Sequence, residues 1–259
     1  MLLLTMRDLA HRWVRFVVVS VLGALVFALL FVMTGLVEQF NLEPADTVAA
    51  IGGDGWLLPE GLSGPFTATA TMPADTLDAV VAAELSAIVA ARTTIGGGVD
   101  EQEGVLLGAV PGELGVPGVS DGRVIEVAGE AMVDASTGAR VGDEIELAGE
   151  PFRVVGLTSD TTLLAGLPLV TVPLGDAQRL AFGSDEVISG AVVFGAVESI
   201  PEGTAVVSAS DVTAATLEPL EGAISSIDLV RGLLWILAAI VIGAVVYLSA
   251  LERQRDFAV

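Results

Sequence analysis

Histidine, cysteine and lysine, three residue types on which much enzyme catalysis depends, are almost absent from this sequence. It contains no cysteine and no lysine, and His11 is its only histidine. The middle of the chain therefore lacks the residues needed for a histidine-activated nucleophile or a cysteine nucleophile. It also lacks the thiolates and imidazoles that bind zinc. Acidic neighbours such as Asp143 and Glu144 arise by chance among 33 acidic residues, and none has the spacing of an EF-hand calcium loop. We predict no catalytic residue, no metal site and no bound cofactor, and we expect no enzyme.

Nucleotide and nucleic-acid binding have no better support. Residues 96–98 are consecutive glycines, but a Walker-type phosphate loop also needs a lysine that reaches the phosphates. The net charge of −22 has the wrong sign for a nucleic-acid partner, which requires a basic surface. If ATP drives this protein, a separate chain must bind it.

Two uncharged segments are long enough to cross a membrane. Residues 16–37 and 232–251, as helices, span about 33 Å and about 30 Å, and a bilayer core is about 30 Å thick. A buried core helix is the alternative for each, and uncharged runs of this length disfavour it. A cleaved signal peptide is a second alternative for the first segment. Its apolar run is longer than the roughly 7–15 residues usual there, and no small-x-small cleavage site follows, so we favour an uncleaved anchor.

Flanking charge predicts the orientation of the two segments. Arginines stand before the first and after the second, at Arg7, Arg12, Arg15, Arg253 and Arg255. By the positive-inside rule both termini are cytoplasmic, and two spans likewise put both termini on the same side of the membrane. Residues 38–231 contain every acidic residue except Asp8, Glu252 and Asp256, and we place them outside.

The predicted organisation has five parts. These are a cytoplasmic amphipathic segment (1–15), a transmembrane helix (16–37), an extracytoplasmic domain (38–231), a second transmembrane helix (232–251) and a cytoplasmic segment (252–259). In the first part, Leu2, Met6, Leu9 and Trp13 recur at helical spacing. That pattern fits a short interfacial helix on the inner leaflet, and equally the start of one continuous helix.

The extracytoplasmic domain is predicted to be α+β. Apolar residues at mixed three- and four-residue spacing indicate a helix over residues 74–92, followed by a glycine-rich loop over 96–104. A hairpin follows, in which residues 145–147 turn through 148–151 into 152–157. Ser208 or Ser210 is expected to cap a final helix that bends near Pro219. Further strands are predicted at 105–110, 124–127, 169–172, 188–194 and 204–207, and a short helix at 174–182.

One weak packing signal lies in the second span. Ala239 and Gly243 form a small-xxx-small pair of the kind that lets another helix approach closely, although small residues are common in membrane helices. Neither span contains a charged residue, so no proton relay or ion ligand of the usual kind is predicted there.

Three stretches give the chain a resemblance to a known family. They are the basic opening from Met6 to Phe16, the hairpin from Val141 to Leu147 with Phe152 to Leu157, and the closing segment Glu252-Arg253-Gln254-Arg255-Asp256-Phe257-Ala258-Val259. Their order and spacing resemble the permease subunit of MacB/FtsX-type ABC transporters. The resemblance implies a cell-membrane protein with a MacB-like core domain outside. Its implied partners are a cytoplasmic ABC ATPase, a second permease copy or paralogue, and the lipid bilayer.

The resemblance also suggests a mechanism and exposes a departure. Family members often transmit force: ATP-driven dimerisation inside moves the helices, and the outer domain changes posture. The resemblance implies that the candidates for ATPase coupling are Arg253, Arg255, Asp256 and Phe257. This role is compatible with anchoring of the helix end at the membrane interface. Family permeases usually carry four spans, whereas this sequence resembles their N-terminal half.

Other functions fit the same outline. A two-span receptor or sensor with an outer ligand-binding domain is the alternative, and it would be expected to carry a cytoplasmic signalling domain. An anchored enzyme is disfavoured by the missing histidine, cysteine and lysine. The transported substrate, if there is one, is not indicated by any residue, and co-purification with an ATPase would separate the permease from the alternatives.

Overall fold

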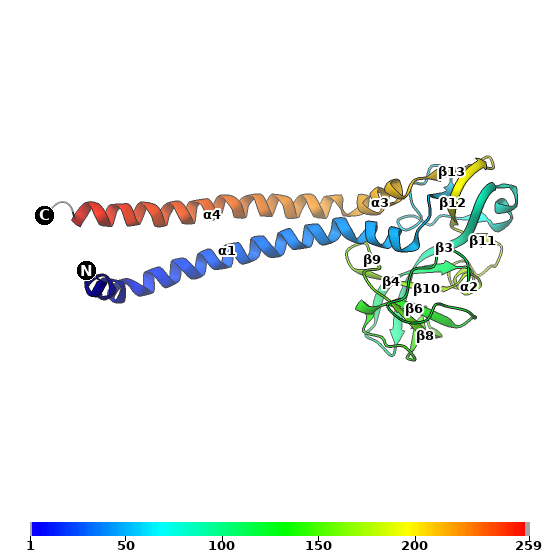
Figure 1. Cartoon of the computed structure of the whole chain (residues 1–259), viewed down its shortest axis with the longest axis horizontal. Helices are drawn as coiled ribbons and strands as arrows, with labels where there is room; N and C mark the ends of the chain where they lie inside the picture. The colour runs from blue at the N-terminus through cyan, green and yellow to red at the C-terminus, as the bar shows by residue number, and fades with distance from the viewer. Residues whose placement is uncertain (1, 257–259) are drawn as a thin grey trace. The chain divides into compact units, whose positions relative to one another are not determined.

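The structure is a computed structural model that describes the backbone of residues 2–256 (Figure 1). The side chains of residues 1–16, 83, 248, 249 and 251–259 lie outside the description. The chain divides into two units, one formed by its two ends up to Glu38 and from Gly222, and one formed by Gln39–Glu221.

Two long helices dominate the first unit. Helix α1 runs from Leu2 to Ile51, and helix α4 from Glu221 to Asp256. The N-terminal segment is therefore helical and continuous with the first predicted span, and α1 extends well past residue 37. It ends where Gly52 and Gly53 adopt φ values of 83° and 96°, which a residue with a side chain rarely does. The Gly52 amide donates to the Val48 carbonyl at 3.0 Å and closes the last turn.

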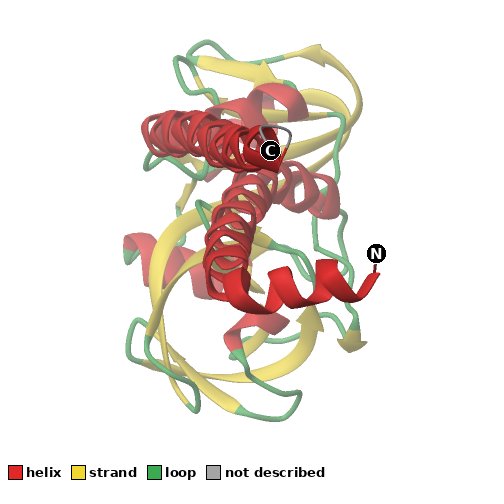
Figure 2. Cartoon of the chain, turned by 90° about the vertical axis from the view of Figure 1, so that its left-hand side faces the viewer, coloured by secondary structure: helices red, strands yellow, loops and turns green. Residues whose placement is uncertain are grey.

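The second unit contains a mixed sheet with the strand order β13-β1-β12-β3-β4-β10-β6-β8-β5. Strand β7 pairs with both β3 and β8, so the strands β3, β4, β10, β6, β8 and β7 close into a ring. Figure 2 shows these strands curving around a common centre. Closure leaves no free edge within the ring. Strands β12, β1 and β13 continue the sheet outward from β3, β5 pairs with β8, β9 pairs with β10, and β2 and β11 form a separate two-stranded sheet.

The strands range in length from two residues in β2 to 17 residues in β3. Their bounds are β1 Gly55–Pro59, β2 Met72–Pro73, β3 Val81–Gly97, β4 Gln102–Ala109, β5 Asp121–Gly122, β6 Glu130–Asp134, β7 Glu144–Leu147, β8 Glu150–Thr158, β9 Thr162–Leu163, β10 Leu167–Pro173, β11 Val187–Ile188, β12 Gly190–Ser199 and β13 Thr204–Val207. The helices of this unit are η1 Ala74–Ala79, η2 Ala135–Thr137, α2 Leu174–Phe182, α3 Ala209–Leu217 and η3 Glu218–Leu220.

Apolar side chains fill the ring and cover the outer part of the sheet. Ile95, Leu147, Phe152 and Val170 belong to one buried cluster with other ring residues, and Ala177 of α2 packs into the same cluster. A second cluster collects residues from the end of α1, from α3 and from the sheet: Val48, Ile51, Trp56, Leu58, Phe66, Ile88, Ala90, Val105, Leu107, Leu163, Leu164, Leu169, Val192 and Val212. This second core therefore joins the start and the end of the domain to its sheet.

The structure confirms the α+β class and most predicted elements, including the 145–157 hairpin and the helix at 174–182. The predicted helix over 74–92 is wrong, because only η1 is helical there and β3 begins at Val81. Strand β3 pairs with β12 on one side and β4 on the other, and this pairing overrides the local helical pattern. The predicted strand at 124–127 is also wrong, and the neighbouring strand β5 is Asp121–Gly122.

Candidate functional site

The apolar parts of α1 and α4 carry their large side chains on the outside. The segments Val17–Ile51 and Ala209–Tyr247 contain stretches of mean hydropathy 2.8 and 2.5, of which 11% and 6% is buried. Phe31 is 77% exposed and Trp235 is 60% exposed. A core helix of a water-soluble protein would be mostly buried, so these surfaces are suited to lipid.

The two long helices touch each other through a small apolar cluster. Val26 and Leu30 of α1 are buried against Ala238 of α4, with Leu234 partly buried beside them. The small Ala238 side chain suits a close approach of the two helices.

The predicted packing pair lies next to this contact and not in it. Ala239 and Gly243 are both exposed, and a methyl group built on Gly243 would meet no atom within 4 Å. Their predicted role in packing against a further helix stays a prediction.

The candidate coupling residues lie at the end of the described chain. Helix α4 continues to Asp256, so Arg253, Arg255 and Asp256 are on a helix that is continuous with the second span. Their side chains lie outside the description, and Phe257 lies outside the described residues altogether. Their proposed contact with an ATPase is therefore not tested by this structure.

Helix α1 enters the second unit and becomes part of its core. Val48 and Ile51 are buried with Trp56, and the Thr47 hydroxyl donates to the Thr162 carbonyl at 2.7 Å. One turn earlier, the Gly166 amide donates to the Glu43 carboxylate at 3.0 Å. The sequence analysis missed these contacts because they join residues more than a hundred positions apart. The signal available was a glutamate and a threonine spaced by one helical turn after the apolar run.

The chain leaves the domain through a second helical connection. The Ser208 hydroxyl accepts a hydrogen bond from the Asp211 amide at 3.2 Å and caps α3, as predicted. Val212 and Thr216 of α3 are fully buried. The helix tightens into η3 at Pro219 and continues as α4, in agreement with the expected irregularity there.

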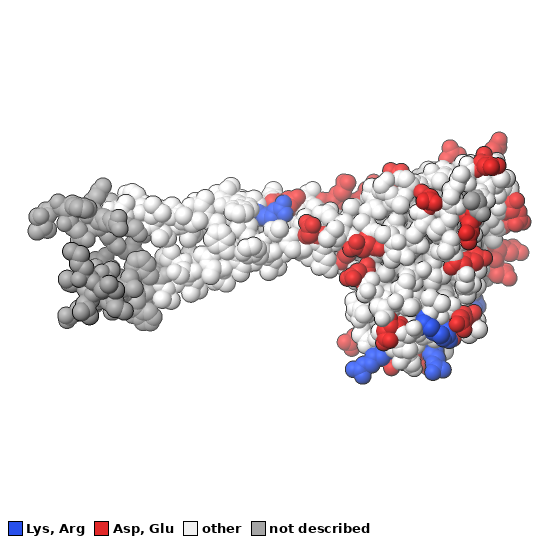
Figure 3. All heavy atoms as spheres, in the orientation of Figure 1, with Lys and Arg blue, Asp and Glu red and all other residues white. Residues whose placement is uncertain are grey.

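Charged side chains elsewhere in the domain form salt bridges and hydrogen bonds that connect nearby segments. Acidic groups are spread over the face shown in Figure 3, with few basic ones among them. The Arg123 guanidinium contacts both carboxylate oxygens of Glu130, and the amides of Glu126 and Val127 donate to the same carboxylate. Arg123 and these amides outweigh burial and lower the pKa of Glu130 to about 2.

Asp134 forms a second, more deeply buried tie. Burial alone would raise its pKa, but hydrogen bonds from Ser136 and Thr161 outweigh burial, and the pKa lies below its usual value. The Thr161 amide and hydroxyl each donate to the same carboxylate oxygen at 2.9 Å. The carboxylate therefore joins the end of β6 to the turn that precedes β9, which is a structural role.

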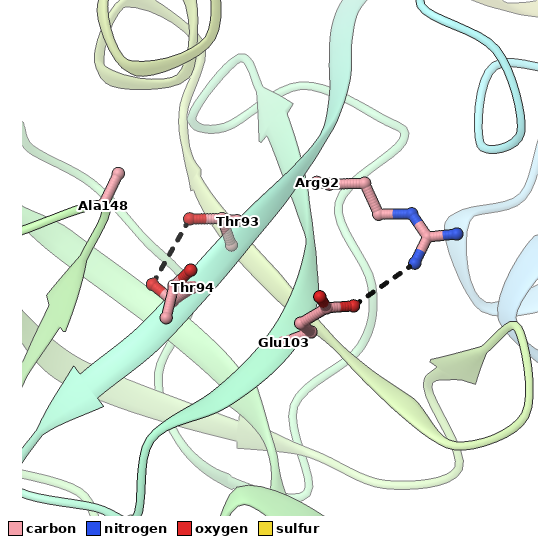
Figure 4. A pocket seen from close by; sticks show the side chains of 5 residues that line it. All are labelled: Arg92, Thr93, Thr94, Glu103 and Ala148. Carbon is pink, nitrogen blue, oxygen red and sulfur yellow. Dashed lines mark hydrogen bonds and ion pairs between the residues drawn. The ribbon is translucent and has the colours of Figure 1, made fainter.

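One shallow hollow lies where β3 and β4 meet the turn after β7 (Figure 4). It is lined by Arg92, Thr93, Thr94, Glu103 and Ala148, and has a volume of about 450 Å³. Arg92 and Glu103 approach to 3.8 Å across it, and both side chains are more than half exposed. A solvent-exposed ion pair of this kind contributes little binding energy. Within the part of the chain described with side chains, no group of acidic or histidine residues is placed to hold a metal ion.

An α+β domain between two lipid-compatible helices fits a membrane permease and also the two-span sensor, and comparison with known proteins favours the permease. The model of the MacB-like periplasmic core domain family matches residues 19–221. The chain therefore belongs to this family, and it is an ABC transporter permease of the MacB type.

The names of curated relatives agree with this assignment. The uncharacterized ABC transporter permease Rv2563 of Mycobacterium tuberculosis is 35% identical over 263 residues, covering 100% of this chain and 75% of the relative. A second one, Rv0072 of the same species, is 34% identical over 264 residues, with the same coverage. The extracellular domain of the noncanonic ABC-type transporter YknZ from Gram-positive bacteria is 16% identical, covering 59% of this chain and 98% of that chain, with a TM-score of 0.43. The periplasmic region of MacB from Actinobacillus actinomycetemcomitans is 12% identical, covering 65% of this chain and 95% of that chain, also with a TM-score of 0.43.

Proposed function

We propose that this permease couples ATP hydrolysis by a separate cytoplasmic ATPase to movement of its extracytoplasmic domain. The chain itself catalyses no reaction in this scheme. Both termini are cytoplasmic, and the domain between the helices lies outside. The sensor alternative is less favoured, because the curated relatives are named as ABC transporter permeases.

The observation that carries the proposal is the continuity of α1 from the candidate span into the domain core. The helix does not stop at the end of its apolar run but continues to Ile51, whose side chain is 3% exposed. Only residues 52–54 separate it from β1, and the Asp54 amide and carboxylate are both hydrogen-bonded to β12. A shift or rotation of α1 that is passed on beyond Pro44 would therefore act on the central sheet, because only three residues separate the helix from β1.

The ATPase partner follows from both sequence and family. The chain lacks the lysine of a Walker-type loop, so the nucleotide must bind elsewhere. Arg253, Arg255, Asp256 and Phe257 are proposed to contact that ATPase at the cytoplasmic end of α4. Ala239 and Gly243 are exposed on the same helix and are proposed to pack against a second permease copy or paralogue within the bilayer.

Co-purification tests this proposal. The full chain is tagged, expressed in its own host, extracted from membranes and reconstituted in lipid nanodiscs, and the bound proteins are identified by mass spectrometry. An ABC ATPase is expected in near-stoichiometric amount. Replacing both Arg253 and Arg255 by glutamate should reduce the recovered ATPase by about tenfold or more, because two charge-assisted contacts become repulsive.

The matched control is Arg231→Gln, which also removes an arginine from α4 but at its opposite end. Arg231 pairs with Asp228 of the same helix at 2.9 Å, and its loss should leave ATPase recovery unchanged. If the native chain in lipid recovers no ATPase, the coupling proposal is wrong and the sensor alternative gains support.

A further inference from the structure

The extramembrane end of α1 carries two buried polar side chains that face one hairpin. Glu43 is 6% exposed and Thr47 is fully buried, and they lie one helical turn apart. Thr47 donates to the Thr162 carbonyl in β9, and Glu43 accepts from the Gly166 amide just before β10. The second Glu43 oxygen accepts from the Gln39 side chain at 2.9 Å, so the carboxylate is held from both sides.

The turn that receives Glu43 has an unfavourable backbone conformation. Leu164, Ala165 and Gly166 have φ values of 54°, 70° and 97° in succession. Only the last is a glycine, and residues with side chains avoid this region because Cβ crowds the backbone. Such a conformation persists only where surrounding contacts impose it. Leu164 is buried in the apolar cluster that also contains Val48 and Ile51, so the end of α1 belongs to the surroundings that hold this turn.

Two further features make this contact suited to opening. Pro44 lies inside α1 beside Glu43 and has no amide to donate to the preceding turn, so the helix is locally weakened. Trp56 lies in the same apolar cluster, and its buried indole N–H has no hydrogen-bond partner among the described residues. An unpaired buried donor is destabilising, so exposure of this cluster to water would recover part of its cost.

We propose that Glu43, Thr47 and the 164–166 turn form a latch that ties α1 to the β9–β10 hairpin. The latch is closed in this structure. Displacement of α1 withdraws the Glu43 carboxylate and the Thr47 hydroxyl, and the 164–166 turn then relaxes. Strand β10 lies between β4 and β6 in the ring, so release of the hairpin frees one end of a central ring strand. What displaces α1 rests on the proposed function, whereas the latch itself does not.

Amide hydrogen exchange of the full chain in lipid nanodiscs tests the latch. Glu43→Ala should speed exchange across the β9–β10 hairpin, including the Gly166 amide, by about tenfold or more, since a charged acceptor of that amide is lost. Exchange in β8 should remain at the native rate. Asp46→Ala is the matched control: it removes an exposed carboxylate from the same helix and should change nothing in the hairpin.

A second pair of variants keeps the test independent of how well Glu43→Ala folds. Thr47→Val removes the hydroxyl with little change in volume and should also speed exchange in the hairpin, whereas Thr47→Ser keeps the donor and should preserve protection. Native exchange in the hairpin of both Glu43→Ala and Thr47→Val would overturn the proposal. So would a parallel rise in the hairpin and β8, because the contacts would then support only global stability. If the exchange results support the latch but no ATPase is recovered with the native chain, the proposed function is wrong and the latch still stands.

Discussion

At the scale of single residues, the Arg123–Glu130 pair shows how an acidic domain keeps one carboxylate charged. Arg123, together with the amides of Glu126 and Val127, stabilises the anion and lowers the pKa of Glu130 to about 2, from an ordinary value of 4.5. The same contacts raise the pKa of Arg123, chiefly through its hydrogen bond to Glu130. The Arg123–Glu130 salt bridge connects the loop after β5 to the start of β6. It therefore links the two ends of a segment that contains no helix or strand.

This pair predicts an acid-dependent loss of stability. Because the folded pKa of Glu130 is depressed, its contribution is fully present above pH 4.5 and is lost as the pH falls toward about 2. Glu130→Gln should lower the free energy of unfolding at neutral pH by about 2 kcal/mol and should flatten its dependence on pH between these values. Denaturant unfolding of the full chain in detergent, measured across this range, checks the prediction. An unchanged pH slope in the variant would contradict it.

The residue scale also shows what a sequence can and cannot reveal. The Ser208 cap was predictable because a cap and its partner lie within one helical turn. The contacts of Glu43 and Thr47 were not, because their spacing by one helical turn does not identify a partner hairpin more than a hundred residues away. The coupling residues Arg253, Arg255, Asp256 and Phe257 were proposed from family resemblance, and they remain a prediction.

At the scale of elements, the junction between α1 and β1 consists of three residues, of which the first two are glycines with positive φ. Gly53 has a φ of 96°, and a methyl group built on it would lie 2.3 Å from Val192 Cγ1 and 3.2 Å from the Val193 carbonyl oxygen. Gly52 has a similar φ, but a methyl group there would meet only Phe194, at 3.7 Å. The glycines thus differ in the space that the sheet leaves them.

Substitutions at this junction should separate backbone strain from steric clash. Gly53→Ala is expected to lower the free energy of unfolding by about 2–4 kcal/mol, because strain and overpacking add. Gly52→Ala should cost only about 1 kcal/mol, from strain alone. Gly222→Ala in α4, where a methyl group meets nothing, should leave stability unchanged or raise it by up to about 1 kcal/mol. Circular dichroism during denaturation measures all three, and equal effects at Gly52 and Gly53 would show the junction to be looser than described.

Elements with a clear pattern in their own sequence were predicted correctly. Elements that depend on hydrogen bonding to distant strands were not. The β7–β8 hairpin has alternating apolar residues around a turn at Ala148 and Gly149, both with positive φ. Strand β3 has helical spacing in its first half and becomes a strand because β12 and β4 flank it. Its neighbours lie far away in sequence or after a loop, so a short window along the chain cannot detect them.

At the scale of the whole molecule, the order of helix, domain and helix was predictable from hydropathy and charge. The long uncharged runs and the arginines that flank them specify it without knowledge of the fold. Closure of the ring was not predictable, because it depends on β7 pairing with β3 and β8 at once. The continuation of α1 to Ile51 was not predicted either, since the charged Glu38 and the internal Pro44 both suggest an earlier end.

The central claim is that ATP hydrolysis moves the outer domain, and a distance measurement tests it most directly. The chain has no cysteine, so spin labels can be placed at chosen sites alone. The labels are attached at Glu202→Cys and Val246→Cys. Glu202 lies in the exposed turn between β12 and β13, and Val246 lies on the exposed side of α4. Pulsed electron paramagnetic resonance then measures the distance between the two labels in the nanodisc complex with its ATPase, in the presence and absence of ATP.

The account predicts that ATP changes the distribution of distances between the two labels by several ångströms, and that a hydrolysis-deficient ATPase holds the ATP-bound distribution. A distribution that stays the same while ATP is hydrolysed at its normal rate would contradict the account, because the outer domain would then not follow the ATPase.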